Sequence, residues 1–299
     1  MNKRRYINKD DLHTGKVRKI NTSEDKFYFG SSSGYVEDAG ERVSKILSRY
    51  GIASRRQAEL LIDKGSVYID GIKIDALGTK VFPGQRICVD GNELSYRSDP
   101  TRLVLLRKKR GVITSRNDPQ QRDTIYTHLP DDMQMLMPIG RLDFNSEGLL
   151  LMTNDGHLKR FMELPINNIS RKYEVRVMRR NRFPKNEKPS YIMKNRATSP
   201  YLCEEDVVAI MAGIRVGQDI YRPVHCELLQ DDLQQNCSRM CITLKEGKNR
   251  EIRKILAYLG FYVTRLVRVS YGKFSLNEIT GKEATEVSPG RLSRYFGYV

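Results

Sequence analysis

The stretch of residues 140–156, GRLDFNSEGLLLMTNDG, decides the fold of the larger part of this chain. It opens as a polar turn and continues in the apolar run Leu149–Met152, which predicts a buried strand. Asp143 lies in the turn, where an acidic side chain usually bonds to its own backbone. Asp143 and Glu147 can alternatively be interpreted as the paired carboxylates of a glycoside hydrolase. The turn therefore marks a candidate site, and the stretch alone leaves its chemistry open.

The sequence on both sides of this stretch predicts a mixed sheet with helices. Leu103–Leu106 predicts a second buried strand, and residues 171–177 alternate between apolar and charged side chains, which predicts a half-buried strand. Residues 252–259 carry apolar side chains at helical spacing, with Asn249 as the expected N-cap. Strand spacing returns over Val263–Tyr271. Because strands and helices do not alternate regularly, we expect an α+β domain.

A smaller unit is predicted upstream, between about residue 39 and residue 96. Ser54 and Gln57 have the spacing of a capping box at the start of a helix. Two Asp-Gly pairs, at residues 70–71 and 90–91, are flanked by apolar residues and predict tight hairpins. The spacing therefore predicts two short helices followed by two hairpins.

Basic residues gather on or beside the two predicted helices of this unit: Lys45, Arg49, Arg55, Arg56 and Lys64. Arg55 and Arg56 fall in the first turn of the second helix, where the helix dipole disfavours cations. A phosphate held by the arginines and the exposed amides would relieve this conflict. We therefore interpret the five residues as RNA-binding, with a solvated helix face as the alternative.

The whole chain is strongly basic, with 52 Lys and Arg against 36 Asp and Glu and a formal net charge of +16. Such a charge attracts polyanions and gains affinity by releasing phosphate counterions, which favours nucleic acid as the partner over a merely soluble basic surface. The cysteines and histidines show no spacing typical of a metal site, so we expect no metal. We find no apolar run that could span a bilayer and no secretory signal, so we expect a cytoplasmic protein without membrane contact.

Residues 140–156 closely resemble the catalytic motif of ribosomal RNA pseudouridine synthases of the RsuA and RluB type. Further segments resemble that family in order and spacing: RKKRGVITSRNDP at 107–119, RKYEVRV at 171–177 and EGKNREIRKILAYLGFYVTRLVRVSYG at 246–272. Residues 41–74 resemble the RNA-binding module first seen in ribosomal protein S-four. The resemblance implies an α+β chain, in which a small N-terminal αL RNA-binding domain precedes a pseudouridine synthase catalytic domain on a mixed, mostly antiparallel sheet.

The resemblance also implies a role for each matching residue. Asp143 matches the catalytic aspartate. Tyr173 matches the tyrosine that stacks on the target base, although its spacing alone would make it a core residue. Arg253 matches the basic residue that pairs with the aspartate in a partly dry pocket, with Arg250 on the same helix as its rival, and Leu266 matches a leucine that packs against the base. Other basic residues are expected to line the cleft and contact RNA: Arg141, Lys248, Arg250, Lys254, Arg265 and Arg268.

We expect three parts in the chain: a flexible extension at 1–38, the S-four-type domain at 39–97 and the catalytic domain at 98–299, with a basic insertion at about 178–203. Lys109 stands where the family usually has proline, a departure that touches no catalytic group. The insertion bears on the choice of substrate rather than on the chemistry.

The sequence thus predicts an rRNA pseudouridine synthase, an isomerase that needs no cofactor because the reaction has no net redox change. We expect a monomer that acts on large-subunit rRNA, with small-subunit rRNA as the close alternative. A non-catalytic rRNA-binding or ribosome-assembly factor on the same fold is the alternative from another class. Such a factor would be expected to lose the aspartate, whereas Asp143, Tyr173 and Arg253 are all present. A hydrolase using Asp143 and Glu147 is a more distant alternative.

Overall fold

The structure is a computed structural model that describes residues 40–50, 52–82, 84–94, 100–116, 118–180, 201–222, 224–232, 234, 236–280 and 283–297. Two compact units are distinguished in the chain. One spans Val36–Pro289, and the other combines the two chain ends, of which residues 290–297 are described. The predicted extension at 1–38 and most of the predicted basic insertion, residues 181–200, lie outside the described residues.

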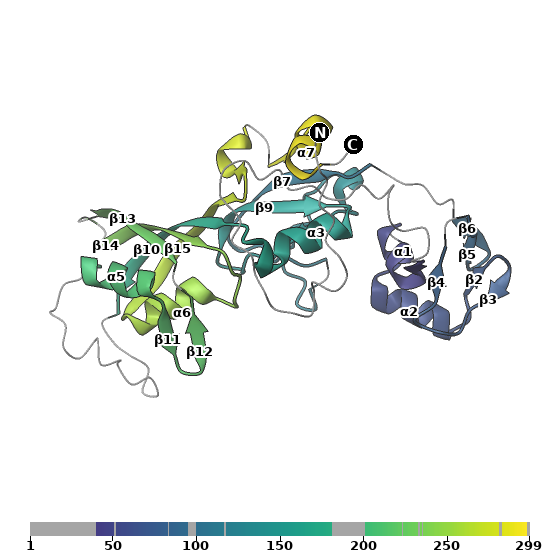
Figure 1. Cartoon of the computed structure of the whole chain (residues 1–299), viewed down its shortest axis with the longest axis horizontal. Helices are drawn as coiled ribbons and strands as arrows, with labels where there is room; N and C mark the ends of the chain where they lie inside the picture. Colours follow the sequence, from purple (N-terminus) through teal and green to yellow (C-terminus); the bar gives the residue numbers. More distant parts are fainter. Residues whose placement is uncertain are drawn as a thin grey trace, which may run out of the picture. The chain divides into compact units, whose positions relative to one another are not determined.

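Residues 40–94 form a small α+β arrangement with a hydrophobic core of its own (Figure 1). Helices α1 (Val43–Arg49) and α2 (Arg55–Asp63) pack on each other and share that core with the strands. One sheet has the strand order β3-β2-β5-β6, and β1 pairs with β4. The strands are β1 (Glu41–Arg42), β2 (Val67–Ile69), β3 (Ile72–Lys73), β4 (Lys80–Val81), β5 (Ile87–Val89) and β6 (Asn92–Leu94).

The local signals of this arrangement are confirmed. Ser54 Oγ accepts a hydrogen bond from the backbone N–H of Gln57, and Gln57 Oε1 accepts one from the N–H of Ser54, which completes the capping box of α2. Asp70 and Gly71 adopt φ angles of 49° and 80°, so both turn residues are left-handed, as a two-residue hairpin turn requires. The pair at residues 90–91 repeats this geometry, with φ angles of 48° and 81°.

The larger part of the chain is built on a nine-stranded mixed sheet (Figure 1). The strand order is β13-β14-β10-β15-β9-β7-β17, with β8 paired to β9 and β16 to β15. Among the described strands of this sheet, only β15 and β9 pair in parallel. The strands are β7 (Leu103–Lys108), β8 (Met137–Ile139), β9 (Glu147–Thr153), β10 (Arg171–Arg179), β13 (His225–Asp232), β14 (Cys237–Leu244), β15 (Phe261–Tyr271), β16 (Phe274–Ser275) and β17 (Ala284–Glu286).

Helices and short turns complete the fold. Helix α6 (Glu251–Tyr258) packs against β15 and shares one hydrophobic core with β10 and β14. Helix α5 (Glu204–Ala212) packs against β13, and α3 (Gly156–Glu163) against β8 and β9. The remaining elements are the hairpin β11 (Ile214–Val216) and β12 (Asp219–Tyr221), the 3-10 turns η2 (Asp131–Met133), η3 (Pro165–Asn167) and η4 (Leu276–Glu278), and helix α7 (Pro289–Phe296).

The start of α6 differs from expectation. Arg250, not Asn249, occupies the N-cap position, and no side chain caps the helix. Arg250 has a left-handed backbone with φ 52° and ψ 32°, which is strained for a residue with a side chain. The chain turns into the helix through this residue, and the N–H of Lys248 donates to Glu251 Oε2 at 3.3 Å. The expected Asn249 cap is therefore wrong, because a left-handed turn replaces it.

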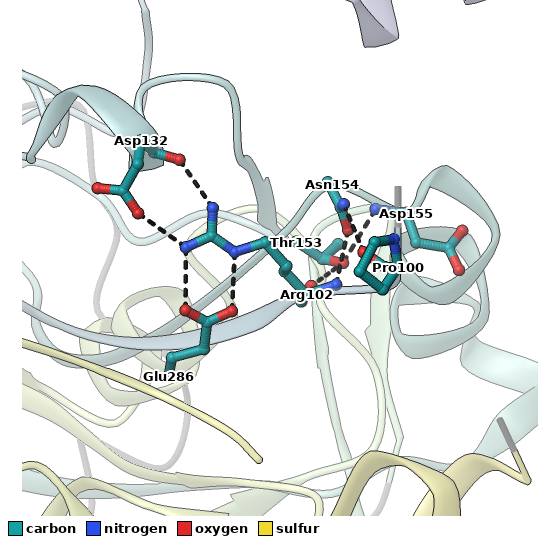
Figure 2. Close-up of polar contacts among 7 residues, drawn as sticks. All are labelled: Pro100, Arg102, Asp132, Thr153, Asn154, Asp155 and Glu286. Carbon is teal, nitrogen blue, oxygen red and sulfur yellow. Dashed lines mark hydrogen bonds and ion pairs between the residues drawn. The ribbon is translucent and has the colours of Figure 1, made fainter. Parts of the chain in front are cut away.

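Arg102 joins the outer strand of the large sheet to a loop from another part of the chain (Figure 2). Its Nε and Nη2 donate to the carboxylate of Glu286 on β17 at 2.7 and 2.9 Å. Its Nη1 and Nη2 donate to the carbonyl and the carboxylate of Asp132, each at 2.9 Å. The hydrogen bond to Glu286 raises the pKa of Arg102 above its ordinary value. The guanidinium therefore stays charged and fastens β17 to the η2 loop.

Candidate active site

The polar turn that leads into β9 is fixed through its backbone. The N–H of Ser146 donates to the carbonyl of Asp143 at 2.9 Å and closes the turn. All five carbonyls from Leu142 to Ser146 accept a hydrogen bond: Leu142 from Thr114 Oγ1, Phe144 from Gly111 N–H, Asn145 from Arg253 Nη2, and both Asp143 and Ser146 from Lys108 Nζ. These hydrogen bonds restrain the backbone of the turn that carries Asp143.

Lys108 also fixes this turn, although the sequence did not mark it as a site residue. Its side chain is buried, and Nζ donates to the carbonyls of Ser146, Lys109 and Asp143 at 2.7, 3.0 and 3.1 Å. Burial lowers the pKa of Lys108 to about 8, while the negative charge of Asp143 opposes this shift. Lys108 ends the apolar strand LVLLRK, and a lysine in such a strand is unusual because lysine is rarely buried without partners. This feature of the sequence could have indicated Lys108 as a site residue.

Gly148 brings the turn against the centre of the sheet. Its φ is +108°, and a Cβ there would lie 2.4 Å from the carbonyl oxygen of Arg268. Arg268 on β15 pairs with Gly148 on one side and with Tyr173 of β10 on the other. These three residues form a row across neighbouring strands, roughly 10 Å from end to end. The turn that carries Asp143 therefore leads into the row that contains Tyr173.

Asp143 is partly exposed, with 42% of its side chain accessible, rather than enclosed in the partly dry pocket that we expected. Its ion-pair partner is Arg250, whose Nη1 lies 3.6 Å from Asp143 Oδ2. This corrects the expected pairing with Arg253, because the left-handed turn at the start of α6 brings Arg250 to the carboxylate instead. Ion pairs between exposed groups contribute little energy, so the backbone of the turn does most of the positioning.

Arg253 holds the backbone around the carboxylate rather than the carboxylate itself. Its Nη2 donates to the carbonyl of Asn145 at 2.9 Å, and its Nη1 to that of Val263 at 3.2 Å. Burial and the charge of Arg250 lower the pKa of Arg253, and the charge of Asp143 opposes them. Arg253 thus links α6, β15 and the turn while remaining in the electric field of Asp143.

Tyr173 and Leu266 lie on the face of the sheet that α6 covers. Tyr173 is 9% exposed, and Leu266 is 6% exposed. Both belong to the core that contains Ile252 and Leu256 of α6. Core packing, which the spacing alone indicates for Tyr173, describes its surroundings. Contact of either residue with a base remains a proposal.

Arg268 does not reach the surface. It is 2% exposed, its Nε donates to the carbonyl of Leu149 at 2.7 Å, and its guanidinium lies 5.0 Å from the ring centre of Tyr271. Position 268 shares the inner face of the sheet with Tyr173, so its side chain turns into the protein. The expected phosphate contact by Arg268 is therefore corrected to a buried contact with the backbone of β9.

The other expected cleft cations are at or near the surface. Arg265 forms a two-pronged ion pair with Glu147, at 2.8 and 3.1 Å. Lys248 donates to Glu246 Oε1 at 3.0 Å and to the carbonyl of Ile220 at 2.5 Å. Lys254 pairs with Asp219 at 2.9 Å, and Arg141 is exposed beside the turn. Arg250 therefore pairs with the Asp143 carboxylate, whereas Arg265 is already engaged by Glu147.

Two carboxyl groups share the loop before α6. Glu251 is 3% exposed, and burial together with the neighbouring Glu246 raises its pKa to about 7. Burial also acts to raise the pKa of Glu246, but hydrogen bonds from Lys248 and from the backbone of Arg222 outweigh it and leave the pKa lowered. The raised pKa of Glu251 and the lowered pKa of Glu246 therefore favour one proton on Glu251, the residue after Arg250.

The basic residues of the N-terminal part fall into two groups. Lys45 and Arg49 both pair with Glu41, at 2.6 and 2.5 Å. Arg55, Arg56 and Lys64 are exposed on or directly after α2, and no ion pair involves them among the residues that the structure describes. The second group is therefore better placed to meet phosphates.

Metal and membrane signals are absent from the described part of the chain. There, no group of three or more His, Cys, Asp or Glu side chains could hold a metal ion, and all five cysteines are free. No helix in those residues has the length and apolar character needed to cross a bilayer.

The site offers the partly exposed carboxylate of Asp143 on a hydrogen-bonded turn. Such a carboxylate can serve as a nucleophile or a base.

Comparison with known families agrees with this geometry. The model of the RNA pseudouridylate synthase family matches residues 102–258, and that of the S4 domain matches residues 41–87. The first match covers more than half of the 299 residues. The two matches therefore define an RNA-modifying isomerase preceded by an RNA-binding module. The chain belongs to the RNA pseudouridine synthase family.

Similar proteins agree along most of the chain. An uncharacterised RNA pseudouridine synthase of Rickettsia felis is 36% identical over 239 residues, which cover 80% of this chain and 93% of the relative. Ribosomal large subunit pseudouridine synthase B of Bacillus subtilis is 32% identical over 254 residues, 85% and 95% of the two chains. A crystal structure of a pseudouridylate synthase matches the fold with a TM-score of 0.55 at 21% identity, over 85% of this chain and 99% of the other. The expected family and fold class are confirmed.

Proposed function

We propose that this enzyme converts a specific uridine of large-subunit ribosomal RNA to pseudouridine, with Asp143 as the catalytic carboxylate. The observation that carries the proposal is the Asp143 turn, whose five bonded carbonyls present an exposed carboxylate next to Arg250. The substrate class is supported by the resemblance to a large-subunit enzyme of Bacillus subtilis.

The reaction breaks the bond between ribose and the base nitrogen, turns the uracil and joins it again through carbon five. Asp143 acts as the nucleophile or as the base in this sequence. The target leaves its stack to reach the carboxylate, which costs a few kcal/mol offset by stacking and phosphate contacts. In this proposal Tyr173 stacks on the extruded base, and Leu266 packs against it from the same sheet face. Carbon five loses its proton in the last step, so the ring regains its double bond.

The domain boundaries follow the same proposal. Residues 39–97 are the S-four-type domain, which binds structured RNA through Arg55, Arg56 and Lys64, and residues 98–299 are the catalytic domain. We propose that the protein is a cytoplasmic monomer, because the reaction needs one carboxylate and its partner is ribosomal RNA. Arg141 and Arg250 contact the RNA beside the extruded base.

The alternative functions are less well supported. A ribosome-assembly factor would not need an acid presented by a fully bonded turn. A hydrolase would need Glu147 as a proton donor, yet the hydrogen bond from Arg265 lowers the pKa of Glu147. An isomerase with one working carboxylate accounts for both features.

The direct test is incubation with unmodified rRNA that carries tritium at carbon five of uridine. We expect release of tritium to water from large-subunit rRNA, and site mapping then identifies the target. Tight binding to both rRNAs without release of label from either would favour the assembly factor. Release from small-subunit rRNA alone would move the substrate to the close alternative.

A further inference from the structure

The residue that follows the proposed catalytic acid is an exposed aromatic ring. Phe144 is 43% exposed, although most large apolar side chains of this domain are buried. Its backbone is fixed, because its carbonyl accepts a hydrogen bond from the N–H of Gly111 at 2.8 Å. A single exposed ring is common at a protein surface, but this one directly follows Asp143 and offers its apolar face to a ligand there.

A second planar group stands beside this ring and comes from another loop. The guanidinium of Arg122 lies 6.0 Å from the ring centre of Phe144. Asp118 holds Arg122 in place, because Nε and Nη2 each donate to its carboxylate at 2.8 Å and the N–H of Arg122 donates at 3.0 Å. Gln121, which lies between Asp118 and Arg122 in the sequence, adopts a left-handed φ of 53°. The hydrogen bonds between Asp118 and Arg122 maintain this strained conformation.

We propose that Phe144 and Arg122 form a stacking platform for the nucleotide base next to the target uridine; this inference rests on the proposed function. Consecutive Cα atoms are about 3.8 Å apart, so the ring lies within the reach of one nucleotide from Asp143. Extrusion of the target deprives its neighbours of a stacking partner, and aromatic rings and arginine planes are the groups that replace one. The charge of Arg122 is already met by Asp118, so this guanidinium offers its plane rather than a phosphate contact.

The test separates base stacking from phosphate binding. Equilibrium affinities of the full chain are measured for a short oligouridylate and for an abasic ribose-phosphate chain of the same length at the same salt concentration. Phe144→Ala weakens binding of the oligouridylate by about tenfold, as expected when one base loses its stacking partner. The same substitution leaves binding of the abasic chain unchanged. Phe144→Tyr retains the affinity of the unmodified protein. Arg122→Lys keeps the charge but loses the plane, and it weakens only the oligouridylate.

The matched control is Tyr262→Ala, which removes another ring that is 41% exposed, on β15. This variant binds both probes like the unmodified protein, and thermal melting checks that all variants fold. Equal affinities of Phe144→Ala and the unmodified protein for oligouridylate, or an equal loss for both probes, would overturn the platform. Tritium release is read separately: its absence from the unmodified protein overturns the proposed function, whereas the binding comparison still decides the role of Phe144.

Discussion

Lys108 and Lys109 are adjacent in the chain, yet their surroundings differ. Lys108 is buried and bonds three carbonyls, two of them in the Asp143 turn, whereas Lys109 is exposed and pairs with Glu283 at the surface. Lys108→Met leaves the carbonyls of Asp143 and Ser146 without this donor. Because misplacement of a reacting group by about 1 Å can cost on the order of 100-fold, we expect kcat for tritium release to fall by ~10- to 100-fold.

Lys109→Met is the control for this change, and we expect its kcat to stay within about twofold of the unmodified enzyme, because exposed ion pairs contribute little. The affinity for rRNA, measured by filter binding, should change little in either variant. Equal losses of kcat in the two variants would contradict a positioning role for Lys108.

At the same scale, the sequence predicts the type of a residue better than its partners. Asp143 stands out because its motif is distinctive. The role of Lys108 could not be predicted, since two of its three acceptors are backbone carbonyls more than thirty residues away in the chain. Arg250 and Arg253 differ by one helical turn, and a left-handed backbone that no local signal indicates decides which one meets the carboxylate.

The contact between β9 and β15 depends on Gly148. Gly148→Ala places a Cβ 2.4 Å from the carbonyl oxygen of Arg268, in a backbone conformation that side chains rarely adopt. Both effects are costly, so we expect a loss of about 3 kcal/mol or more in the free energy of unfolding, measured by urea titration. Gly247→Ala is the control, because nothing lies within 4 Å of its added Cβ. A Gly148→Ala protein as stable as this control would refute the close approach.

The loop before α6 should make stability depend on pH through Glu251. Its folded pKa of about 7 lies above the ordinary 4.5, so the folded state holds this proton more tightly than the unfolded chain does. The contribution is fully present below about pH 4.5 and is lost as the pH rises through 7. Glutamine stays neutral at every pH, so we expect Glu251→Gln to become more stable relative to the unmodified protein as the pH rises from 5.5 to 8. The relative gain is roughly 1–2 kcal/mol in the free energy of unfolding, which corresponds to a few degrees in Tm.

The melting comparison reports on position 251, because the lowered pKa of Glu246 lies below this pH range. A constant difference in Tm across this pH range would contradict the raised pKa.

The helices and strands themselves were largely predictable, since the alternation at 171–177 and the Asp-Gly turns carry their geometry locally. The parallel pairing of β9 with β15 was not predictable, because it joins segments over a hundred residues apart.

The molecule as a whole combines an RNA-binding module with a catalytic domain in a strongly basic chain. Arg55→Glu with Arg56→Glu reverses two exposed charges at the start of α2. We expect weaker binding to rRNA and a flatter dependence of affinity on salt, because fewer phosphate counterions are released. Lys80→Glu, a single exposed charge on β4, is the control and should change the slope less. An unchanged salt slope in the double variant would remove α2 from the interface.

In the proposed function one carboxylate, Asp143, performs the isomerisation from a turn whose carbonyls are all hydrogen-bonded. This proposal is tested most directly by comparing tritium release from rRNA by Asp143→Asn and Glu147→Gln, with rRNA affinity and Tm measured on the same preparations. We expect Asp143→Asn to bind rRNA normally but to release no label above background, while Glu147→Gln retains most activity. Release by Asp143→Asn at the rate of the unmodified enzyme would contradict this proposal.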